Sequence, residues 1–382
     1  MIFTNARLIF PEGIRDGLEI IESGGKICGV RKTGLYPQPD ACDLGGNFVA
    51  PGFIDLHLHG ANGRDAMEAD GEAFGEICRY HASGGTTSLL LTTATAPLPH
   101  IFRALAAIRI CKSEMPQITG AHVEGPFISK DRAGAQNKDF IRDPNAESVN
   151  ALLEFSDVIK RITLAPELPG ALAAIDCFRA KEIAVSGGHS NAWDDEALAA
   201  VARGMHSVTH TFNCMSSMRR REGERVAGLL EVALSEPEIM CELIADGHHV
   251  STTLMKMLYR AKGRAGICLV TDASAGAGLP NESSFKLGEV DCVVKDGACW
   301  VADHSALAGS AARMIDLVRT MVRDVDVPLH EAIGMATVNP ARASQLKEKG
   351  TLEVGTDADL VVISPDLQVV KTFLGGEEIF AA

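Results

Sequence analysis

The sequence predicts an α/β fold, a TIM-like (β/α)8 barrel with a small β-sandwich domain formed from both ends of the chain. Short apolar segments alternate with amphipathic helical segments about eight times in the middle of the chain, and both ends are rich in strand and turn residues. No Gly-x-Gly-x-x-Gly loop follows the early strands, which favours a closed barrel over an open doubly wound sheet.

The first 50 residues have the pattern of short strands joined by glycine turns. Apolar and β-branched residues predict strands at 1–10, 17–23, 26–32 and 47–50, and Gly24-Gly25 indicates a hairpin between two of them. From Gly350 onward the chain returns to strand and turn residues. We therefore expect residues 1–50 and 344–382 to form one small β domain beside the barrel.

Residues 51–343 supply the expected barrel. Each predicted strand is short and apolar and is followed by a longer segment with helical periodicity. The strands are expected at residues 52–58, 86–92, 118–123, 161–164, 182–186, 207–209, 242–245 and 267–271. Because barrel enzymes place their chemistry at the carboxyl ends of these strands, the residues that follow each strand are the candidates for function.

The composition excludes several classes of partner. The 382 residues are 46% hydrophobic and 23% charged, as in globular proteins with a large core. A formal net charge of −14 disfavours nucleic acid or an anionic membrane as a partner. The 10 cysteines form no Cys-x-x-Cys pair, which predicts reduced thiols. The N-terminus has no signal-peptide pattern and no apolar run approaches a membrane span, so we expect a cytoplasmic protein.

The most informative segment is Pro-Gly-Phe-Ile-Asp-Leu-His-Leu-His-Gly at residues 51–60. Side chains two residues apart on a strand point to the same face, so His57 and His59 could bind one metal ion together. The Pro-Gly start and Gly60 mark the two ends of this strand. A buried strand with two hydrogen-bonded histidines is the alternative interpretation of the segment alone.

Further metal-binding residue types accompany later strands. Glu124, His189, His210 and Asp272 follow the third, fifth, sixth and eighth predicted strands. Several histidines with one or two carboxylates suit a catalytic zinc or iron ion that keeps one position open for water. A lone histidine is more often a core residue and Asp272 alone could cap a helix, but together they favour a metal site. His122 would lie about 7 Å deeper in the barrel and orient a ligand.

Seven short segments resemble motifs of the amidohydrolase superfamily, and the match extends in order over nearly the whole chain. The most specific motif is His-Val-Glu-Gly-Pro-Phe at residues 122–127. The others lie at residues 51–60, 188–190, 209–213, 245–249, 269–273 and 308–310. The resemblance implies the same barrel and terminal β domain that the strand pattern predicts.

The resemblance also implies a set of metal ligands. Glu124, His189 and His210 would bind the principal ion. His57 and His59 would hold a second ion, with the Glu124 carboxylate bridging the two. We expect one or two divalent ions per subunit, with Zn²⁺ first and Fe²⁺, Mn²⁺ and Co²⁺ as alternatives, because the same ligands suit all four metals.

The remaining roles follow from the same resemblance. Asp272 would lie at the metal and serve as the catalytic acid/base, and the substrate-binding residues would be His249, Asn213, Cys214 and Arg221. Residues 218–221 read Met-Arg-Arg-Arg, an unusual run in so acidic a chain, and a guanidinium matches phosphate oxygens as a bidentate donor. A solvated basic loop is the alternative interpretation of that run.

The activity that the resemblance implies is hydrolysis of the acetamide of N-acetylglucosamine 6-phosphate to glucosamine 6-phosphate and acetate, by a homodimer. Two loops depart from the family pattern. Gln136, a further predicted substrate contact, stands where relatives usually have histidine and cannot carry a proton. Residues 223–226 contain one extra residue, which leaves the alignment of Arg221 open. N-acetylgalactosamine 6-phosphate, another N-acyl or cyclic amide, and a non-enzymatic sugar-phosphate sensor therefore stay as alternatives.

Overall fold

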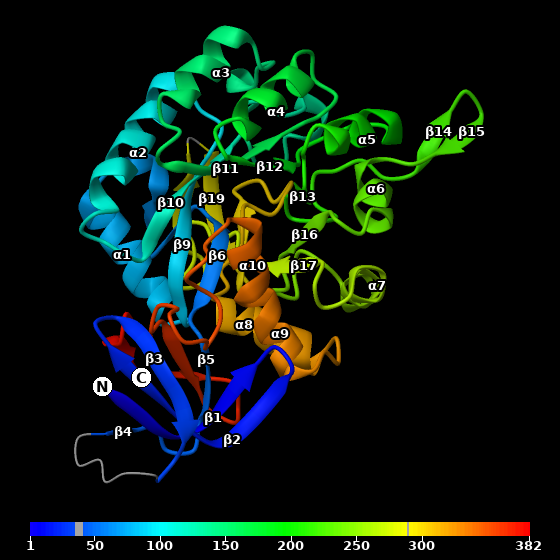
Figure 1. Cartoon of the computed structure of the whole chain (residues 1–382). Coiled ribbons are helices and arrows are strands. Elements are labelled where there is room, and N and C mark those ends of the chain that lie inside the picture. The colour runs from blue at the N-terminus through cyan, green and yellow to red at the C-terminus, as the bar shows by residue number, and fades with distance from the viewer. Residues whose placement is uncertain (35–40, 289) are drawn as a thin grey trace.

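The computed structural model describes residues 1–34, 41–288 and 290–382 and confirms the predicted fold (Figure 1). The barrel strands are β6 Phe53–Leu58, β9 Thr86–Thr93, β10 Ile118–Glu124, β11 Ile159–Leu164, β12 Ala184–Gly187, β13 Ser207–Val208, β16 Met240–Leu243 and β17 Ile267–Leu269. They form one parallel sheet in the order β17-β16-β13-β12-β11-β10-β9-β6. All eight predicted barrel strands are therefore present.

Helices follow the barrel strands and surround the sheet (Figure 1). They are α1 Gly71–Ala82, α2 Leu98–Cys111, α3 Ala146–Leu153, α4 Ala171–Arg179, α5 Asp194–Ala202, α6 Leu229–Ser235, α7 Thr252–Lys262, α8 Met314–Arg323, α9 Leu329–Ala336 and α10 Val338–Ala343. Helix α1 shows how the sequence determines where a helix begins and which face it buries. Asp70 caps its start by accepting the Ala73 N–H, and Phe74 and Ile77 bury its apolar face.

The sheet closes into a barrel where the segment after β17 meets β6. Leu58 forms a parallel bridge with Ala273. The Asp272 N–H donates to the His57 carbonyl at 2.8 Å, and the His59 N–H donates to the Ala273 carbonyl at 2.7 Å. Closure therefore brings His57 and His59 beside Asp272, more than 200 residues later in the chain.

The two chain ends pair in a second sheet. Its strands are β1 Ile2–Phe10, β2 Gly13–Ser23, β3 Lys26–Lys32, β4 Cys42–Asp43, β5 Phe48–Pro51, β21 Leu360–Ile363, β22 Val369–Leu374 and β23 Glu377–Ala381. Strand β5 joins the ends by pairing with both β1 and β21. The rings of Phe3 on β1 and Phe373 on β22 lie 4.9 Å apart although two strands separate them, because the sheet curls over its own core as a sandwich does. The division of the chain at residues 51 and 343 stays a prediction.

Three groups of strands were not predicted. β14 Arg219–Arg221 and β15 Glu224–Val226 form an antiparallel hairpin that projects from the barrel (Figure 1). Its turn contains Glu222 and Gly223 with φ of 52° and 92°, the left-handed backbone of a tight hairpin turn. β18 Ser284–Leu287, β19 Val290–Lys295 and β20 Ala298–Val301 form a three-stranded sheet after β17. The short pair β7 Gly60–Ala61 and β8 Arg64–Asp65 lies just after β6.

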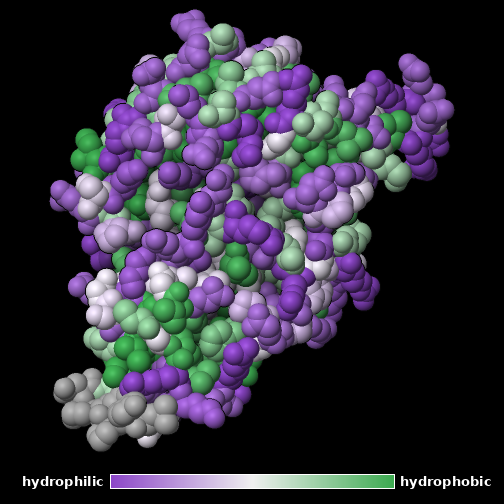
Figure 2. Space-filling model, viewed as in Figure 1, coloured by the Kyte–Doolittle hydropathy of each residue, from purple (hydrophilic) through white to green (hydrophobic). Residues whose placement is uncertain are grey.

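The face of the molecule that contains the projecting hairpin is largely polar (Figure 2). Hydrophilic residues cover most of the face seen in Figure 2, including the tip of the projecting hairpin. Within the described ranges, no helix has the length and apolarity needed to cross a membrane. All 10 cysteines are unpaired, which agrees with the predicted reduced thiols.

Gly85 lies where the barrel meets the terminal sheet, and its replacement tests this junction. Its φ is +89°, and an added Cβ would lie 2.7 Å from Val361 Cγ2 and 2.8 Å from Phe53 Cδ2. We expect Gly85→Ala to lower the free energy of unfolding by about 1–2 kcal/mol because alanine is strained in the left-handed backbone. Overpacking against Val361 and Phe53 should lower it by about 1–3 kcal/mol more. The measurement is the thermal unfolding midpoint. Gly17→Ala is the matched control, because Gly17 has a φ of +70° and no neighbour within 4 Å; equal midpoints for the two variants would contradict tight packing at the junction.

Candidate functional site

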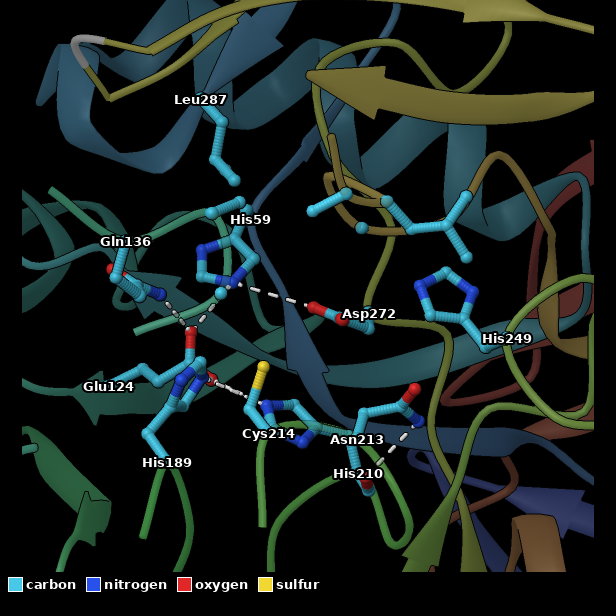
Figure 3. A pocket seen from close by; sticks show the side chains of 15 residues that line it. His59, Glu124, Gln136, His189, His210, Asn213, Cys214, His249, Asp272 and Leu287 are labelled. Atoms are coloured by element: carbon cyan, nitrogen blue, oxygen red, sulfur yellow. Dashed lines mark hydrogen bonds and ion pairs between the residues drawn. The ribbon is translucent and has the colours of Figure 1, made fainter. Parts of the chain in front are cut away.

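The predicted metal ligands lie together at the carboxyl end of the barrel, around the carboxylate of Glu124 (Figure 3). Glu124 Oε1 lies 3.1 Å from His189 Nε2 and 3.2 Å from His210 Nε2. Its other oxygen, Oε2, lies 3.1 Å from His59 Nε2. His57 lies deeper, with Nε2 3.4 Å from Glu124 Oε1. One buried carboxylate therefore contacts four imidazoles from three different parts of the chain.

The donor atoms fit a divalent metal ion. Two groups of three buried side chains have ligand atoms within 4.8 Å of one another, and Glu124 belongs to both. His189 Nε2 and His210 Nε2 are 3.0 Å apart. Because His189 Nδ1 donates to the Arg132 carbonyl at 2.8 Å, Nε2 of the neutral ring carries a lone pair directed at Glu124 and His210. Lone pairs and a carboxylate that converge in this way repel one another unless a cation lies between them.

The backbone is left-handed at three of the predicted metal ligands. The φ angles of His189, His210 and Asp272 are 46°, 30° and 49°. Such angles are uncommon for residues other than glycine, and they are concentrated at functional sites. Each of the three follows the end of a barrel strand, where the left-handed turn ends the extended backbone. Asp272 caps no helix, since α8, the next helix, begins at Met314.

Asp272 lies beside the second group of ligands. Its Oδ1 is 3.4 Å from His57 Nε2 and 3.5 Å from His59 Nε2. Burial would raise the pKa of Glu124, but the imidazoles of His57, His189 and His210, when protonated, hold the pKa of Glu124 well below its usual value. Glu124 is therefore ionised at neutral pH, which is the form that binds a cation.

A cavity of about 220 Å³ opens over these residues (Figure 3). Four of the predicted substrate-binding residues line it: Gln136, Asn213, Cys214 and His249. Leu287 from β18 and Leu307 add apolar surface to the wall. A small concave site with convergent polar groups and an apolar wall suits a small molecule rather than a polymer.

Gln136 uses both ends of its amide within the protein. Its Nε2 donates to Glu124 Oε2 at 2.7 Å, and its Oε1 accepts the Thr95 N–H at 2.7 Å. These two bonds fix the orientation of the Glu124 carboxylate. A residue predicted as a substrate contact thus also orients the central ligand.

His249 is held by a buried carboxylate. Its Nδ1 lies 2.8 Å from Asp246 Oδ2, and because an ionised carboxylate only accepts, Nδ1 carries the hydrogen. Burial disfavours the charged imidazole, but the hydrogen bond to Asp246 outweighs it and raises the pKa of His249. Asp246 therefore favours a positively charged His249 in the cavity wall.

Arg221, the predicted phosphate contact, lies outside this cavity. It belongs to the projecting hairpin, where its Nη1 lies 3.3 Å from Asp195 Oδ1 and its guanidinium lies over the Trp193 ring. The hairpin carries Arg221 away from the barrel, so Arg221 does not line the cavity of its own chain. Sequence spacing could not predict this, because the direction of a hairpin depends on what it packs against.

The layer beneath the ligands includes a residue that was not predicted. Glu242 on β16 has Oε2 3.3 Å from His57 Nδ1 and accepts the His210 N–H at 3.2 Å. A signal for it was present, because an acidic residue within Met-Cys-Glu-Leu-Ile is costly to bury without a partner. His122 lies in the same layer, with its ring 4.6 Å from that of His57 and Nε2 2.8 Å from Thr163 Oγ1.

Comparison with known proteins gives a consistent result. The amidohydrolase family profile matches residues 48–379. The N-acetylglucosamine-6-phosphate deacetylase of Lysinibacillus sphaericus is 34% identical over 98% of this chain and 97% of its own length. The crystal structure of the Pasteurella multocida N-acetylglucosamine-6-phosphate deacetylase has a TM-score of 0.94 and 32% identity, covering 100% of this chain and 99% of that one.

A Mycobacterium smegmatis N-acetyl-D-glucosamine-6-phosphate deacetylase variant, solved in complex with N-acetyl-D-glucosamine-6-phosphate, superimposes with a TM-score of 0.93 and 30% identity. The superposition covers 100% of this chain and 99% of that chain. Members of the superfamily depend on metal ions, and the histidines and Glu124 of this chain form groups that could bind one. The matched profile, the full-length relatives and the closed barrel agree, and this chain belongs to the amidohydrolase family.

Proposed function

We propose that this protein is a metal-dependent deacetylase that converts N-acetylglucosamine 6-phosphate into glucosamine 6-phosphate and acetate. The observation that carries the proposal is the convergence of the buried ligands and Asp272 on one small cavity. Relatives that match the chain over its full length are deacetylases of this sugar phosphate, which supports the same substrate.

The residues of the cavity divide the reaction between them. A divalent ion held by Glu124, His189 and His210 would lower the pKa of a water molecule to about 7 and polarise the acetamide carbonyl. Asp272 takes a proton from the attacking water and delivers it to the departing nitrogen, because the amine is a poor leaving group unless its nitrogen is protonated. His249, held by Asp246, donates a hydrogen bond to the carbonyl oxygen as negative charge develops there.

The substrate phosphate needs a cationic partner that no lysine or arginine in the described lining of the cavity supplies. We propose that the protein acts as a homodimer in which the β14–β15 hairpin supplies arginines to the cavity of the neighbouring subunit. The run Arg219–Arg221, of which Arg220 and Arg221 are exposed, lies on a projecting element and is the observation that supports this arrangement.

The metal and the compartment are part of the same proposal. Zn²⁺ is the proposed ion, in one or two equivalents per subunit, and Fe²⁺, Mn²⁺ or Co²⁺ suit the same imidazole and carboxylate ligands. We propose a cytoplasmic location, which the unpaired cysteines and a phosphorylated substrate support, since thiols stay reduced there.

The proposal predicts acetate release that depends on metal and phosphate. Zn²⁺-loaded protein should release acetate from N-acetylglucosamine 6-phosphate, and a chelator should abolish the release because hydroxide is scarce without the ion. A coupled acetate assay over that ester, N-acetylgalactosamine 6-phosphate and unphosphorylated N-acetylglucosamine makes the measurement. Equal rates without phosphate would favour another amidohydrolase, and tight binding without turnover would favour a sensor. No acetate from either phosphate ester would end the proposal.

Asp272→Asn should remove the acid/base step while keeping the fold. Asparagine tolerates the left-handed backbone at this position, so the turn is preserved. We expect kcat to fall by about 10²–10⁴-fold with a smaller change in KM, measured by steady-state acetate release. Asp366→Asn, at an exposed aspartate of the terminal sheet, is the control. An Asp272→Asn protein with wild-type kcat would exclude the assigned role.

Replacing His57 and His59 together with asparagine should separate the two ion positions. We expect the double variant to lose one metal equivalent and keep residual activity, because Glu124, His189 and His210 still bind the principal ion. Elemental analysis of the purified protein gives the metal content. A double replacement of the exposed His100 and His304 should change neither quantity. Loss of all metal would contradict this division of the ligands.

A further inference from the structure

A buried ion pair inside the barrel takes no part in the proposed reaction. Arg161 on β11 and Glu242 on β16 are both almost fully buried, and Arg161 Nη2 lies 2.6 Å from Glu242 Oε1. The same Nη2 donates to Ser186 Oγ and Ser207 Oγ on the two strands between them, at 2.9 Å each. A buried ion pair adds little net stability compared with apolar residues, so stability alone is a weak explanation for it.

The other oxygen of Glu242 faces the metal ligands. Oε2 lies 3.3 Å from His57 Nδ1 and accepts the backbone N–H of His210 at 3.2 Å. His57 belongs to one group of proposed ligands and His210 to the other. Glu242 therefore contacts one residue of each ligand group although it belongs to neither group.

The contact with His57 decides which nitrogen of the ring carries hydrogen. A carboxylate only accepts hydrogen bonds, so Glu242 keeps the hydrogen on Nδ1 and leaves the Nε2 lone pair free. His57 Nε2 is the atom that faces Glu124 and Asp272, at 3.4 Å from each. An imidazole with its hydrogen on Nε2 would have no lone pair to offer an ion there.

Arg161 fixes which way Glu242 points. A guanidinium only donates, so it holds Oε1 on its own side and turns Oε2 towards His57 and His210. In a Glu242→Gln variant the amide oxygen would turn to Arg161, and the amide NH₂ would face His57 Nδ1 and the His210 N–H. The amide NH₂ would then face two other N–H donors. The neutral His57 ring would therefore carry its hydrogen on Nε2, so that Nδ1 could accept from the amide.

We propose that Glu242, oriented by Arg161, is the positioning residue that enables ion binding at the His57 and His59 position. The proposal rests on the metal site of the proposed function and adds a determinant that lies outside both groups of ligands. Binding of the second ion then depends on the Glu242 carboxylate, which lies beneath the ligands, as well as on His57 and His59.

The test uses two double variants that both lack the buried charges. Arg161→Met/Glu242→Gln keeps an acceptor that is free to turn towards His57, whereas Arg161→Met/Glu242→Leu has none. Zn²⁺ affinity of the full-length protein is measured by competition with a chromophoric chelator, and fold by the thermal unfolding midpoint. We expect the Gln double variant to bind the second Zn²⁺ about 10–100-fold more tightly than the Leu double variant at similar midpoints. The single Glu242→Gln variant should bind the second Zn²⁺ as weakly as the Leu double variant does.

Two further readouts separate this proposal from a structural role and from the deacetylase assignment. ¹⁵N chemical shifts of His57 should report hydrogen on Nδ1 in the Gln double variant and on Nε2 in Glu242→Gln. If Glu242 served only to neutralise Arg161, the affinity for the second Zn²⁺ would change only in proportion to the unfolding midpoint. The two double variants would then bind the second Zn²⁺ with equal affinity. That agreement, or a wild-type protein that binds a single Zn²⁺, overturns the proposal. The metal titration needs no turnover, so failed acetate release would refute the substrate without affecting this result.

Discussion

The contact of one buried carboxylate with four imidazoles is the interaction on which the site depends. Glu124 is only 2% exposed, so the surrounding imidazoles and the Gln136 amide must compensate for most of the water that its charge has lost. His59, His189 and His210 belong to parts of the chain that meet only when the barrel is closed. The hydrogen bonds between β6 and the segment around Ala273 are therefore a condition for the site as well as for the fold.

The parts of the site that follow strand geometry could be predicted from the sequence. The spacing of His57 and His59 places both side chains on one face of a strand, and Glu124 follows a short, mostly apolar run that predicts a buried strand. Parallel strands around a barrel share one carboxyl end, so residues that follow different strands were expected to meet. The eight barrel strands were predicted for the same reason, because each is a short apolar segment followed by a helix.

The parts that depend on packing could not be predicted. The Arg132 carbonyl that orients His189 is a backbone atom and has no sequence signature. Asp246 lies in an Asp-Gly turn, where aspartate is ordinary, so its contact with His249 gave no signal. The position of Arg221 depends on how the β14–β15 hairpin packs beside Trp193. Leu287 reaches the cavity from a three-stranded sheet whose existence the strand pattern did not reveal.

The left-handed backbone at His189, His210 and Asp272 has a consequence for how such a site changes over evolutionary time. Few side chains other than glycine, asparagine, aspartate and histidine adopt these φ angles without strain, so each of the three positions tolerates a narrow set of replacements. His57 and His59 have no such restriction, because neither residue has a positive φ. The backbone therefore tolerates a wider range of substitutions at His57 and His59, which would hold the second ion, than at His189 and His210. A lineage can gain or lose the second ion by single substitutions on a strand, while the residues around the first ion are retained by the shape of the chain itself.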